Sequence, residues 1–540
     1  ILEFFGKGGS DLLKLEQVKL KPEQLEEQLL TKAAQLLRVP AGDILSLSVL
    51  RRAVDARQPL HLVYTLAVSV RGEKAVLRRC RDKNVTRYAP VAYALPDPVT
   101  TAPQLPPVVV GAGPAGLFAA LILANAGLRP ILLERGQPVE QRQKDVEAFW
   151  SGGALLPESN VQFGEGGAGA FSDGKLNTGT KDPRHRFILE HLVSCGAPES
   201  ILTDAKPHVG TDQLHITLIE LRKRLLSLGA DIRFGHRLEK LETEDGGLRA
   251  IAVSGPAGAY TLPARQLVLA LGHSARDTVE QLYDQGLSMV AKPFAVGVRI
   301  EHLQSRMDAV QYKEYAGHPA LPVSSYKLSC HLPDGRGVFS FCVCPGGQVV
   351  AAASEPRRTV TNGMSEYARS GENINGGLLV SVTPEDFGSG HPLAGIAFQR
   401  RLEEAAYRLG GGYTAPCQRV EDFLLHRPST GCGSVKPSYR PGVRYGDLHG
   451  CLPEFICSAL EQALPVLEKK LPGFADGDAL LTAVESRSSA PVRILRDENC
   501  ESNIRGVFPC GEGAGYAGGI LSAAADGMRC AEKIWEAYIK

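Results

Sequence analysis

This sequence lacks an excess of charge of either sign. Its 540 residues include 60 basic and 59 acidic residues, which leaves a formal net charge of +1. A chain without excess positive charge has no long-range attraction for nucleic acid or for an anionic membrane surface. We therefore expect no nucleic acid and no membrane as partners, and the sequence leaves the oligomeric state open.

The sequence also lacks a cysteine framework. Its 12 cysteines include no CxxC pair and show no regular spacing, and a chain of this length does not need disulfides to fold. We expect free thiols in a reducing compartment, which makes the cytoplasm the predicted location. One run without charged residues, 107–128, is interrupted by glycine and proline, so we interpret it as a buried strand, turn and helix and not as a membrane span.

Internal repeats and low-complexity tracts are absent, and the length predicts about three domains. The first residues, 1–11, do not continue into the pattern that follows them, so we interpret them as a remnant or a truncated start. From residue 12 the pattern predicts a small ferredoxin-like domain with the order βαββαβ over 12–95. Its predicted elements are strands over 12–20, 43–54, 60–71 and 87–95, and helices over 22–39 and around 74–83.

Two details support this division. Leu25, Leu29, Ala33 and Leu36 recur at helical spacing in the first predicted helix. Prolines then crowd residues 96–106, and because proline fixes φ and removes a backbone donor, this stretch predicts a stiff linker.

Residues 107–134 contain a dinucleotide-binding fingerprint. An apolar strand leads into GxGxxG at Gly111, Gly113 and Gly116, an apolar helix follows, and a second strand ends at Glu134. The first glycine allows a tight turn, the second lets backbone approach a pyrophosphate, and the third lets helix and strand pack closely. The helix N-terminus faces the phosphates, and the acid is expected to accept hydrogen bonds from the adenosine ribose. An acid here disfavours a 2′-phosphate, so the pattern predicts FAD or NAD.

The C-terminal segment GVFPCGEGAGYAGGI favours FAD. A strand over 507–510 is followed by Glu512 and by a glycine turn that opens a helix at Gly519. The segment resembles the end of flavoproteins of the glutathione-reductase superfamily, in which the acid binds the ribityl and phosphate region and the helix N-terminus points at flavin N1 and O2. A helix N-terminus at that edge stabilises the negative charge of reduced flavin. We expect non-covalent FAD, because no attachment motif is present.

Further predicted contacts come from the segments between these motifs. Arg142 lies eight residues after Glu134, where related flavoproteins carry an arginine directed at FAD; a solvated helix arginine is the alternative. GADIRFGHRLEKLE resembles the strand that passes the adenine, where Leu238 would contribute backbone. The predicted cofactor-binding residues are Gly111, Gly113, Pro114, Ala115, Gly116, Glu134, Arg135, Arg142, Gly166, Gly167, Gly169, Ser172, Lys175, Leu238, Gly272, Gly511, Glu512, Gly518, Gly519 and Ile520.

Together these patterns predict an α/β fold. We expect a Rossmann-like FAD-binding domain over 107–284 and 481–540, with an inserted mixed α+β substrate or cap domain over 285–480 and the ferredoxin-like α+β domain in front. The inserted region is richer in short β runs and loops than the segments around it.

Four motifs, QFGEGGAGAFSDGKLNTGTKD (162–182), FCVCPGGQVV (341–350), VTNGMS (360–365) and VESRSSAPVRILRD (484–497), carry a resemblance to one family. The chain resembles the uncharacterised bacterial FAD-dependent dehydrogenases that carry an N-terminal ferredoxin-like domain, with relatives in plants. RRAVDAR in the small domain matches as well, whereas Val343 stands where we expect a methionine. The resemblance indicates the family and not the substrate.

The first motif is a glycine loop that can approach a ligand by its backbone, because glycines leave few side chains in the way. Ser172 and Lys175 are then expected to donate to a phosphate or a flavin carbonyl, and a mobile surface loop is the alternative. Arg487 and Arg493 lie a few residues before the C-terminal segment. We expect them to face the flavin or a substrate carboxylate, and structural ion pairs are the alternative.

The sequence leaves the catalytic residues undetermined, with Arg487, Arg493, Cys344 and Lys175 as weak candidates. Cys342 and Cys344 lack the CxxC turn of thiol oxidoreductases and lack neighbours at zinc spacing, so burial on one strand face is the favoured interpretation. His273 and His302 lie near predicted strand ends. We expect them to be packing or surface residues, and a general acid or base role is the alternative. No metal site is predicted.

The leading functional hypothesis is an FAD-dependent oxidoreductase, a dehydrogenase or reductase that passes hydride between flavin N5 and a small molecule. No second GxGxxG with strand and helix context follows residue 150, so a separate nicotinamide domain is not expected, and NAD(P)H is at most a transient reductant. The alternatives are a flavoprotein acting on RNA, a non-catalytic interaction protein with FAD as a scaffold, and an oxygen-using hydroxylase.

Overall fold

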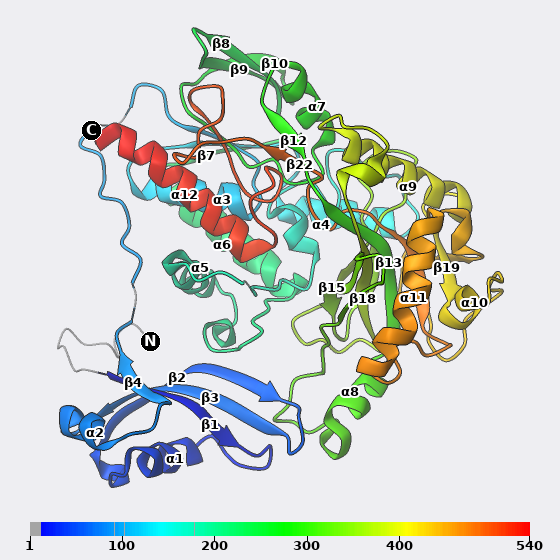
Figure 1. The fold of residues 1–540 in the computed structure, drawn as a ribbon. Coiled ribbons are helices and arrows are strands. Elements are labelled where there is room, and N and C mark those ends of the chain that lie inside the picture. Colours follow the sequence, from blue (N-terminus) through cyan, green and yellow to red (C-terminus); the bar gives the residue numbers. More distant parts are fainter. Residues whose placement is uncertain (1–11, 91, 102, 178, 540) are drawn as a thin grey trace.

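The computed structural model describes residues 12–90, 92–101, 103–177 and 179–539, and the segment 1–11 that we interpreted as a remnant or truncated start lies outside them. Figure 1 shows three bodies: a small N-terminal sheet, a parallel sheet covered by helices, and a second large sheet flanked by α9 and α11. The fold is mixed α/β, as expected. Within the described residues, we find no helix with both the length and the apolar character needed to cross a membrane.

The N-terminal body is a four-stranded antiparallel sheet in the order β2-β3-β1-β4 with two helices. Alternation of apolar side chains in LLKLEQVKL buries Leu13 and Leu15 against the helices, as expected for a half-buried strand. Its elements are β1 (Leu12–Leu20), α1 (Gln28–Leu37), β2 (Ile44–Asp55), β3 (His61–Val70), α2 (Glu73–Arg79) and β4 (Val85–Tyr88). The element order agrees with βαββαβ, and the ferredoxin-like assignment stays a prediction.

Two predicted elements of this body are shorter in the structure. The helix expected over 22–39 begins only at Gln28, and Leu25 is 66% exposed before it. The strand expected over 87–95 ends at Tyr88, and Pro90 offers no backbone donor to extend it.

The proline-rich segment after this body is bonded to the rest of the protein. Val99 N–H donates to the Ala126 carbonyl at 2.9 Å, and the Trp535 indole donates to the Asp97 carbonyl at 2.9 Å. The small body also meets the main body at Arg52, whose N–H donates to the Thr203 carbonyl at 2.7 Å. Independent folding of 12–95 stays a prediction.

The central body contains a five-stranded, all-parallel sheet in the order β23-β11-β5-β6-β7. Because every carboxyl end lies at the same edge of the sheet, the loops that follow these strands converge there. The strands are β5 (Val108–Val110), β6 (Ile131–Glu134), β7 (Asp231–Phe234), β11 (Leu267–Leu269) and β23 (Val507–Pro509). The helices are α3 (Pro114–Asn125), α4 (Val139–Trp150), α5 (Pro183–Ser194), α6 (Thr211–Ser227), α7 (Arg276–Asp284) and α12 (Ile520–Ile539).

The charge-free run 107–128 consists of β5, a turn and α3, and ten of the twelve helix residues are buried. The helix is apolar on all sides because the sheet and α12 both cover it (Figure 1). Gly527 in α12 allows this contact, since a Cβ there would lie 2.0 Å from the Ala115 carbonyl oxygen.

An antiparallel meander packs on the opposite face of the parallel sheet. Leu238, Leu241 and Ile251 of the meander share a core cluster with Val108 and Leu267 of the sheet. Its strands are β8 (Arg237–Glu244), β9 (Gly247–Gly255) and β10 (Gly258–Pro263), in the order β10-β9-β8.

The inserted body is built on a seven-stranded sheet in the order β14-β15-β18-β13-β21-β19-β20. The chain leaves the central body through β12 (Met289–Ala291) and returns through β22 (Val492–Ile494), which pair with each other. The sheet strands are β13 (Phe294–Leu303), β14 (Ser329–His331), β15 (Gly337–Cys344), β18 (Asn373–Val382), β19 (Ala415–Arg419), β20 (Val443–Tyr445) and β21 (Leu480–Glu485). A hairpin of β16 (Gln348–Ala351) and β17 (Thr361–Met364) and helices α8 (Gln304–Tyr312), α9 (Ala394–Gly410), α10 (Val420–Leu424) and α11 (Glu454–Lys470) complete it.

This topology corrects one predicted boundary. We expected the FAD-binding domain to resume at residue 481, but Leu480–Glu485 is β21, which pairs with β13 and β19 inside the inserted sheet. The return therefore lies after Glu485. An apolar strand has no local signal for its sheet, so only its partners reveal where it belongs.

Candidate active site

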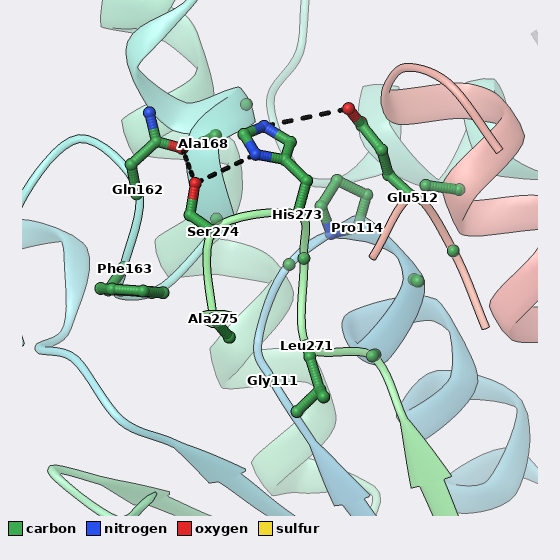
Figure 2. Close-up of a pocket in the computed structure, with 18 of the residues that line it drawn as sticks. Gly111, Pro114, Gln162, Phe163, Ala168, Leu271, His273, Ser274, Ala275 and Glu512 are labelled. Carbon is green, nitrogen blue, oxygen red and sulfur yellow. Dashed lines mark hydrogen bonds and ion pairs between the residues drawn. The ribbon is translucent and has the colours of Figure 1, made fainter. Parts of the chain in front are cut away.

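A cavity of about 490 Å³ lies at the carboxyl edge of the parallel sheet and extends to the inserted body. Eighteen of the predicted site residues line it, contributed by both ends of the chain and by the glycine loop. They are Gly111, Gly113, Pro114, Ala115, Glu134, Arg135, Gly167, Gly169, Ser172, Lys175, Leu238, Gly272, Arg487, Gly511, Glu512, Gly518, Gly519 and Ile520. Figure 2 shows part of this lining, with Gly111 in the turn after β5 and Pro114 at the start of α3.

The three fingerprint glycines have different environments. Gly111 has φ +103°, and a Cβ there would lie 2.3 Å from the Ala270 carbonyl oxygen; a Cβ on Gly116 would lie 1.8 Å from the Gly111 carbonyl oxygen. These two glycines therefore make the turn and the helix–strand contact possible, and Gly116 lies behind the cavity lining. At Gly113 a Cβ would meet only Gly167 Cα, at 3.9 Å, so its space belongs to the cavity.

The N-terminus of α3 is open to this space. Its N-cap, Gly113, provides no side-chain cap, so the amides of the first turn keep their donors for another partner. Uncapped amides and the helix dipole bind anions well. An empty space beside them, kept free by glycine, fits a pyrophosphate.

Glu134 closes the turn from the end of β6. Its carboxylate accepts hydrogen bonds from the backbone N–H of Ala112 at 2.7 Å, of Gly136 at 2.8 Å and of Gly164 at 3.0 Å. A carboxylate oxygen can accept more than one hydrogen bond, so the group retains capacity toward the cavity that it lines. This geometry fits a ribose placed beside the turn.

Arg135 lines the cavity with its charge already paired. Its guanidinium lies 4.1 Å from the Phe163 ring centroid and bonds Glu158 at 2.7 Å and Asp277 at 2.8 Å. Arginine stacked on an aromatic ring and held by two carboxylates forms a rigid wall more readily than a phosphate clamp.

Arg142 does not face the cavity, which corrects our expectation that it is directed at FAD. Its side chain is fully buried, and it donates to the carbonyl oxygens of Asn160 at 2.8 Å, Val161 at 2.9 Å and Glu165 at 2.7 Å. A solvated helix arginine, the alternative, is equally wrong. The side chain instead holds the start of the glycine loop, whose carbonyls have no other partners in a sheet or helix.

The glycine loop uses most of its own polar groups. Ser172 Oγ donates to the Gly169 carbonyl at 2.8 Å and accepts from Gly174 N–H at 3.0 Å, although the residue lines the cavity. Gly166 packs behind the loop, since a Cβ there would lie 2.4 Å from Leu218 Cδ1 on α6. We had expected Gly166 at the cofactor, and the structure gives it a packing role.

The C-terminal segment brings Glu512 and the start of α12 to the cavity. Gly519 N–H lies 3.5 Å from Glu512 Oε2, and burial raises the pKa of Glu512 to about 7. Figure 2 shows His273 between Ser274 and Glu512, with its Nε2 3.9 Å from Glu512 Oε1. Burial, together with Arg487 and Arg276, lowers the pKa of His273 to about 3, so this imidazole stays neutral at physiological pH.

Arg487 and Arg493 lie in different environments. Arg487 lines the cavity but is held by Glu403, with Nε and Nη2 each 3.0 Å from a carboxylate oxygen, and its Nη1 donates to Ser354 at 2.6 Å. Arg493 is exposed and donates to the Gly515 carbonyl at 3.2 Å, away from the cavity. Arg487 therefore has ion-pair partners beside the cavity, and Arg493 is not among the cavity-lining residues.

The end of the cavity that faces the inserted body contains the predicted Lys175 together with two acids, Asp173 and Glu485, that the sequence did not reveal. Lys175 Nζ lies 3.2 Å from Asp173 Oδ2, and both residues line the cavity with Cys342, Asn362 and Glu485. The signal for Asp173 was present in SDGK and that for Glu485 in VESRSS, but neither motif indicates which side chain turns inward.

Glu485 is the acid of this end whose pKa is raised, whereas Lys175 and Arg369 lower the pKa of Asp173. Arg299 Nη1 lies 3.1 and 3.0 Å from its two carboxylate oxygens. Burial raises the pKa of Glu485 to about 7 against the opposing charge of Arg299. A carboxyl group with this pKa both holds and releases a proton near neutral pH.

Cys344 is buried behind the lining, whereas Cys342 lines the cavity. We expected both thiols to be buried on one strand face. This holds for Cys344 and not for Cys342. His302 lies in the inserted core, where its ring Nε2 is 2.7 Å from the Phe474 carbonyl oxygen, so packing is its role.

One histidine cluster elsewhere has metal-like spacing. His426, His449 and Glu461 approach one another, but His449 already bonds Asp447 at 2.6 Å and Glu461 at 2.8 Å. The two imidazole rings are stacked 4.7 Å apart at 27°, which does not direct their lone pairs at one point. We assign no metal here, and the absence of a metal site stays a prediction.

Three family models match parts of the chain. Residues 293–488 match an FAD-dependent protein, C-terminal domain-like; residues 107–167 match an FAD binding domain; and residues 13–71 match a domain of unknown function. The FAD binding domain match spans the fingerprint turn, Glu134 and the start of the glycine loop.

One similar protein matches the chain over nearly its full length. An uncharacterised protein of Clostridium beijerinckii is 45% identical over 531 residues, which are 97% of this chain and 99% of that protein. The 12-dehydrotetracycline 5-monooxygenase/anhydrotetracycline 6-monooxygenase of Streptomyces rimosus is 31% identical over 170 residues, 30% of this chain and 29% of that protein. A glycerol-3-phosphate dehydrogenase of Bacillus halodurans complexed with FAD has 13% identity and a TM-score of 0.35, covering 81% of this chain and 64% of that one. The chain is thus a flavoprotein that binds FAD, and it belongs to the same family as the Clostridium beijerinckii protein.

Proposed function

We propose that the protein is a dehydrogenase or reductase that passes hydride between flavin N5 and a small-molecule substrate bound beneath the inserted body. The observation that carries this proposal is the continuity of one cavity, which begins at the fingerprint turn and ends among Lys175, Cys342 and Glu485. A cofactor held at the turn thereby reaches ionisable groups of a second body, where substrates of two-body enzymes bind.

In this proposal the adenosine and pyrophosphate half of FAD is held by the first turn of α3 and by Glu134. Gly113 leaves room for the pyrophosphate, and the uncapped amides of α3 bind its charge. Leu238, which is 1% exposed, lines the cavity and would contact the adenine.

Glu512, Gly519 and Ile520 line the cavity near the start of α12 and would hold the flavin half. The helix N-terminus would stabilise negative charge there. When bound, FAD supplies hydride transfer at N5. Glu485 holds or releases the accompanying proton of the substrate, and Lys175 lies beside it as the cationic group.

The proposed domain limits are 12–95 for the small domain, 96–106 for the linker, and 285 to about 486 for the substrate domain. The small domain is expected to leave the flavin untouched, because no residue of 12–90 is among the cavity lining. Deletion of residues 1–88, which keeps the bonded linker, should leave the FAD content unchanged. Loss of FAD from a folded deletion variant would contradict this division.

The experiment is an anaerobic screen of the FAD-loaded protein. NADH, NADPH and panels of alcohols, amines, acids and quinones are mixed with the protein, and the flavin absorbance is followed for bleaching or reoxidation. A small-molecule donor or acceptor should change the flavin much faster than it changes free FAD. Glu485→Gln should slow this change while FAD content stays equal, and Glu404→Gln, remote from the cavity, should not slow it.

Other results would point to the alternatives. Oxygen uptake that depends on an aromatic substrate would indicate a hydroxylase, the class of the partly similar Streptomyces rimosus enzyme. Copurified RNA would indicate a flavoprotein acting on RNA. Flavin that is reduced by dithionite but by no metabolite would favour FAD as a scaffold.

A further inference from the structure

Two thiols at the inserted end of the cavity share one ammonium group. Lys175 Nζ lies 3.9 Å from Cys342 Sγ and 3.7 Å from Cys344 Sγ. Cys344 Sγ also donates to the backbone carbonyl of Cys342 at 3.3 Å. The structure thus brings together two sulfurs of one strand and a lysine 167 residues away.

A local irregularity of β15 produces this arrangement. The pairing of β15 with β18 shifts register between Phe341 and Cys344, and Cys342 has φ +41°. A non-glycine residue in this left-handed region is uncommon, and such residues gather at functional sites. The bulge turns Cys342 toward the cavity while Cys344 stays buried behind it.

The charges around the pair favour one thiolate. Arg299 Nη2 donates to the Cys342 carbonyl at 3.0 Å and lies 3.7 Å from Cys344 Sγ, so a second cation joins Lys175. The neighbouring Cys344 thiol, with Lys175 and Arg299, lowers the pKa of Cys342 well below that of a free thiol. The neighbouring Cys342 thiolate and burial raise the pKa of Cys344. The pair therefore contains a cavity-facing thiolate and a thiol, the combination that thiol–disulfide chemistry uses.

Another buried cysteine of this sheet shows the contrast. Cys417 is bonded by Thr482 Oγ1 at 3.7 Å, and burial raises its pKa to about 12. It does not line the cavity. Burial in the inserted sheet alone therefore does not create a reactive thiol, and the cations beside Cys342 make the difference.

We propose that Cys342 and Cys344 are a redox-active pair that exchanges two electrons with FAD. This inference rests on the proposed function, because it needs the flavin at this end of the cavity. The Cys342 thiolate and the Cys344 thiol form an S–S bond and lose two electrons and one proton. Oxidised flavin takes up the two electrons and the proton and becomes the reduced anion; the reverse step restores the thiolate and thiol. Lys175, paired with Asp173, stays in place for the return.

The test counts electrons in the FAD-loaded, full-length protein. The protein is oxidised with ferricyanide, freed of it, and titrated anaerobically with dithionite while the flavin absorbance is followed. Wild-type protein should take up four electrons per FAD, two for the flavin and two for the pair, and should show two more free thiols after reduction. Cys342→Ser and Cys344→Ser should each take up two electrons, and Cys417→Ser should take up four.

A second readout does not depend on the variants. The peptide that contains both cysteines should be two hydrogens lighter after oxidation, because the disulfide lies within it. Uptake of two electrons by wild-type protein, with an unchanged thiol count and peptide mass, would overturn the proposal even if the variants failed to fold. Since dithionite replaces any substrate, this result is independent of the hydride screen. Four-electron uptake with no active metabolite would leave the pair standing and remove the proposed reaction.

Discussion

Glu403 and Arg276 join two bodies of the protein through a pair of hydrogen bonds, 2.7 Å between Oε1 and Nη2 and 2.9 Å between Oε2 and Nη1. Glu403 lies in α9 of the inserted body, and Arg276 begins α7 of the central body. The same carboxylate binds Arg487 at the cavity, and all three side chains are buried. One acid therefore aligns the two halves of the candidate active site.

Replacing this acid should loosen the contact between the two bodies. Glu403→Gln leaves Glu355 as the remaining acid for the two buried arginines, and losing one member of a buried ion pair costs about 3–5 kcal/mol. We expect the free energy of unfolding, measured by denaturant titration, to fall by about this amount. Glu404→Gln, whose ion pair with Arg358 is 43% exposed at the acid, should cost less than about 1 kcal/mol. Equal losses in both variants would contradict the buried role of Glu403.

The fingerprint glycines should separate folding from cofactor binding. Gly113→Ala adds a Cβ that contacts only Gly167 Cα at 3.9 Å, so the apo protein should keep its thermal midpoint while its FAD content falls sharply. Gly116→Ala places a Cβ 1.8 Å from the Gly111 carbonyl oxygen and should lower the midpoint even without FAD. The measurements are thermal unfolding of apo protein and FAD released on denaturation. A Gly113→Ala protein with full FAD would show that the pyrophosphate lies elsewhere.

Arg142 should stabilise the protein with or without cofactor. Arg142→Met leaves buried carbonyls of Asn160, Val161 and Glu165 without their donor, and each unsatisfied buried group costs about 1–3 kcal/mol. We expect similar losses of unfolding free energy in the apo and FAD-loaded forms. A loss confined to the loaded form would mean that the side chain binds FAD after all.

His302 predicts a pH dependence of stability. Burial lowers its pKa to about 4, while the unfolded chain binds a proton near pH 6.5. Between these values the unfolded chain holds more protons, so this histidine lowers stability as the pH falls from 6.5 to 4, by at most about 1.4 kcal/mol per pH unit.

Denaturant titrations at several pH values should reveal this slope. His302→Gln should flatten the decline below pH 6.5, because glutamine does not take up a proton. His331→Gln, at an exposed position, is the matched control and should keep the wild-type slope. An unchanged slope in His302→Gln would show that the ring is accessible to protonation in the folded protein.

The cofactor end of the site was predictable from the sequence alone. Gly111, Gly113 and Glu134 lie within one strand–turn–helix–strand unit, so local chain geometry brings them together without help from distant residues. The same holds for Glu512 and Gly519, which flank one turn before a helix. Motifs of this kind state their geometry in residue type and spacing, because glycine conformation and helix termini are local properties.

The substrate end was decided by the tertiary structure. Lys175 meets Cys342 and Cys344 across more than 160 positions, and β21 shows its sheet only by pairing with β13. Arg142 binds the glycine loop and not the cavity where we expected the cofactor, and this too depends on tertiary contacts. Which buried donor finds which acceptor depends on strand register, on a bulge and on the shared burial of charges, and these arise from contacts between segments that are far apart in the chain.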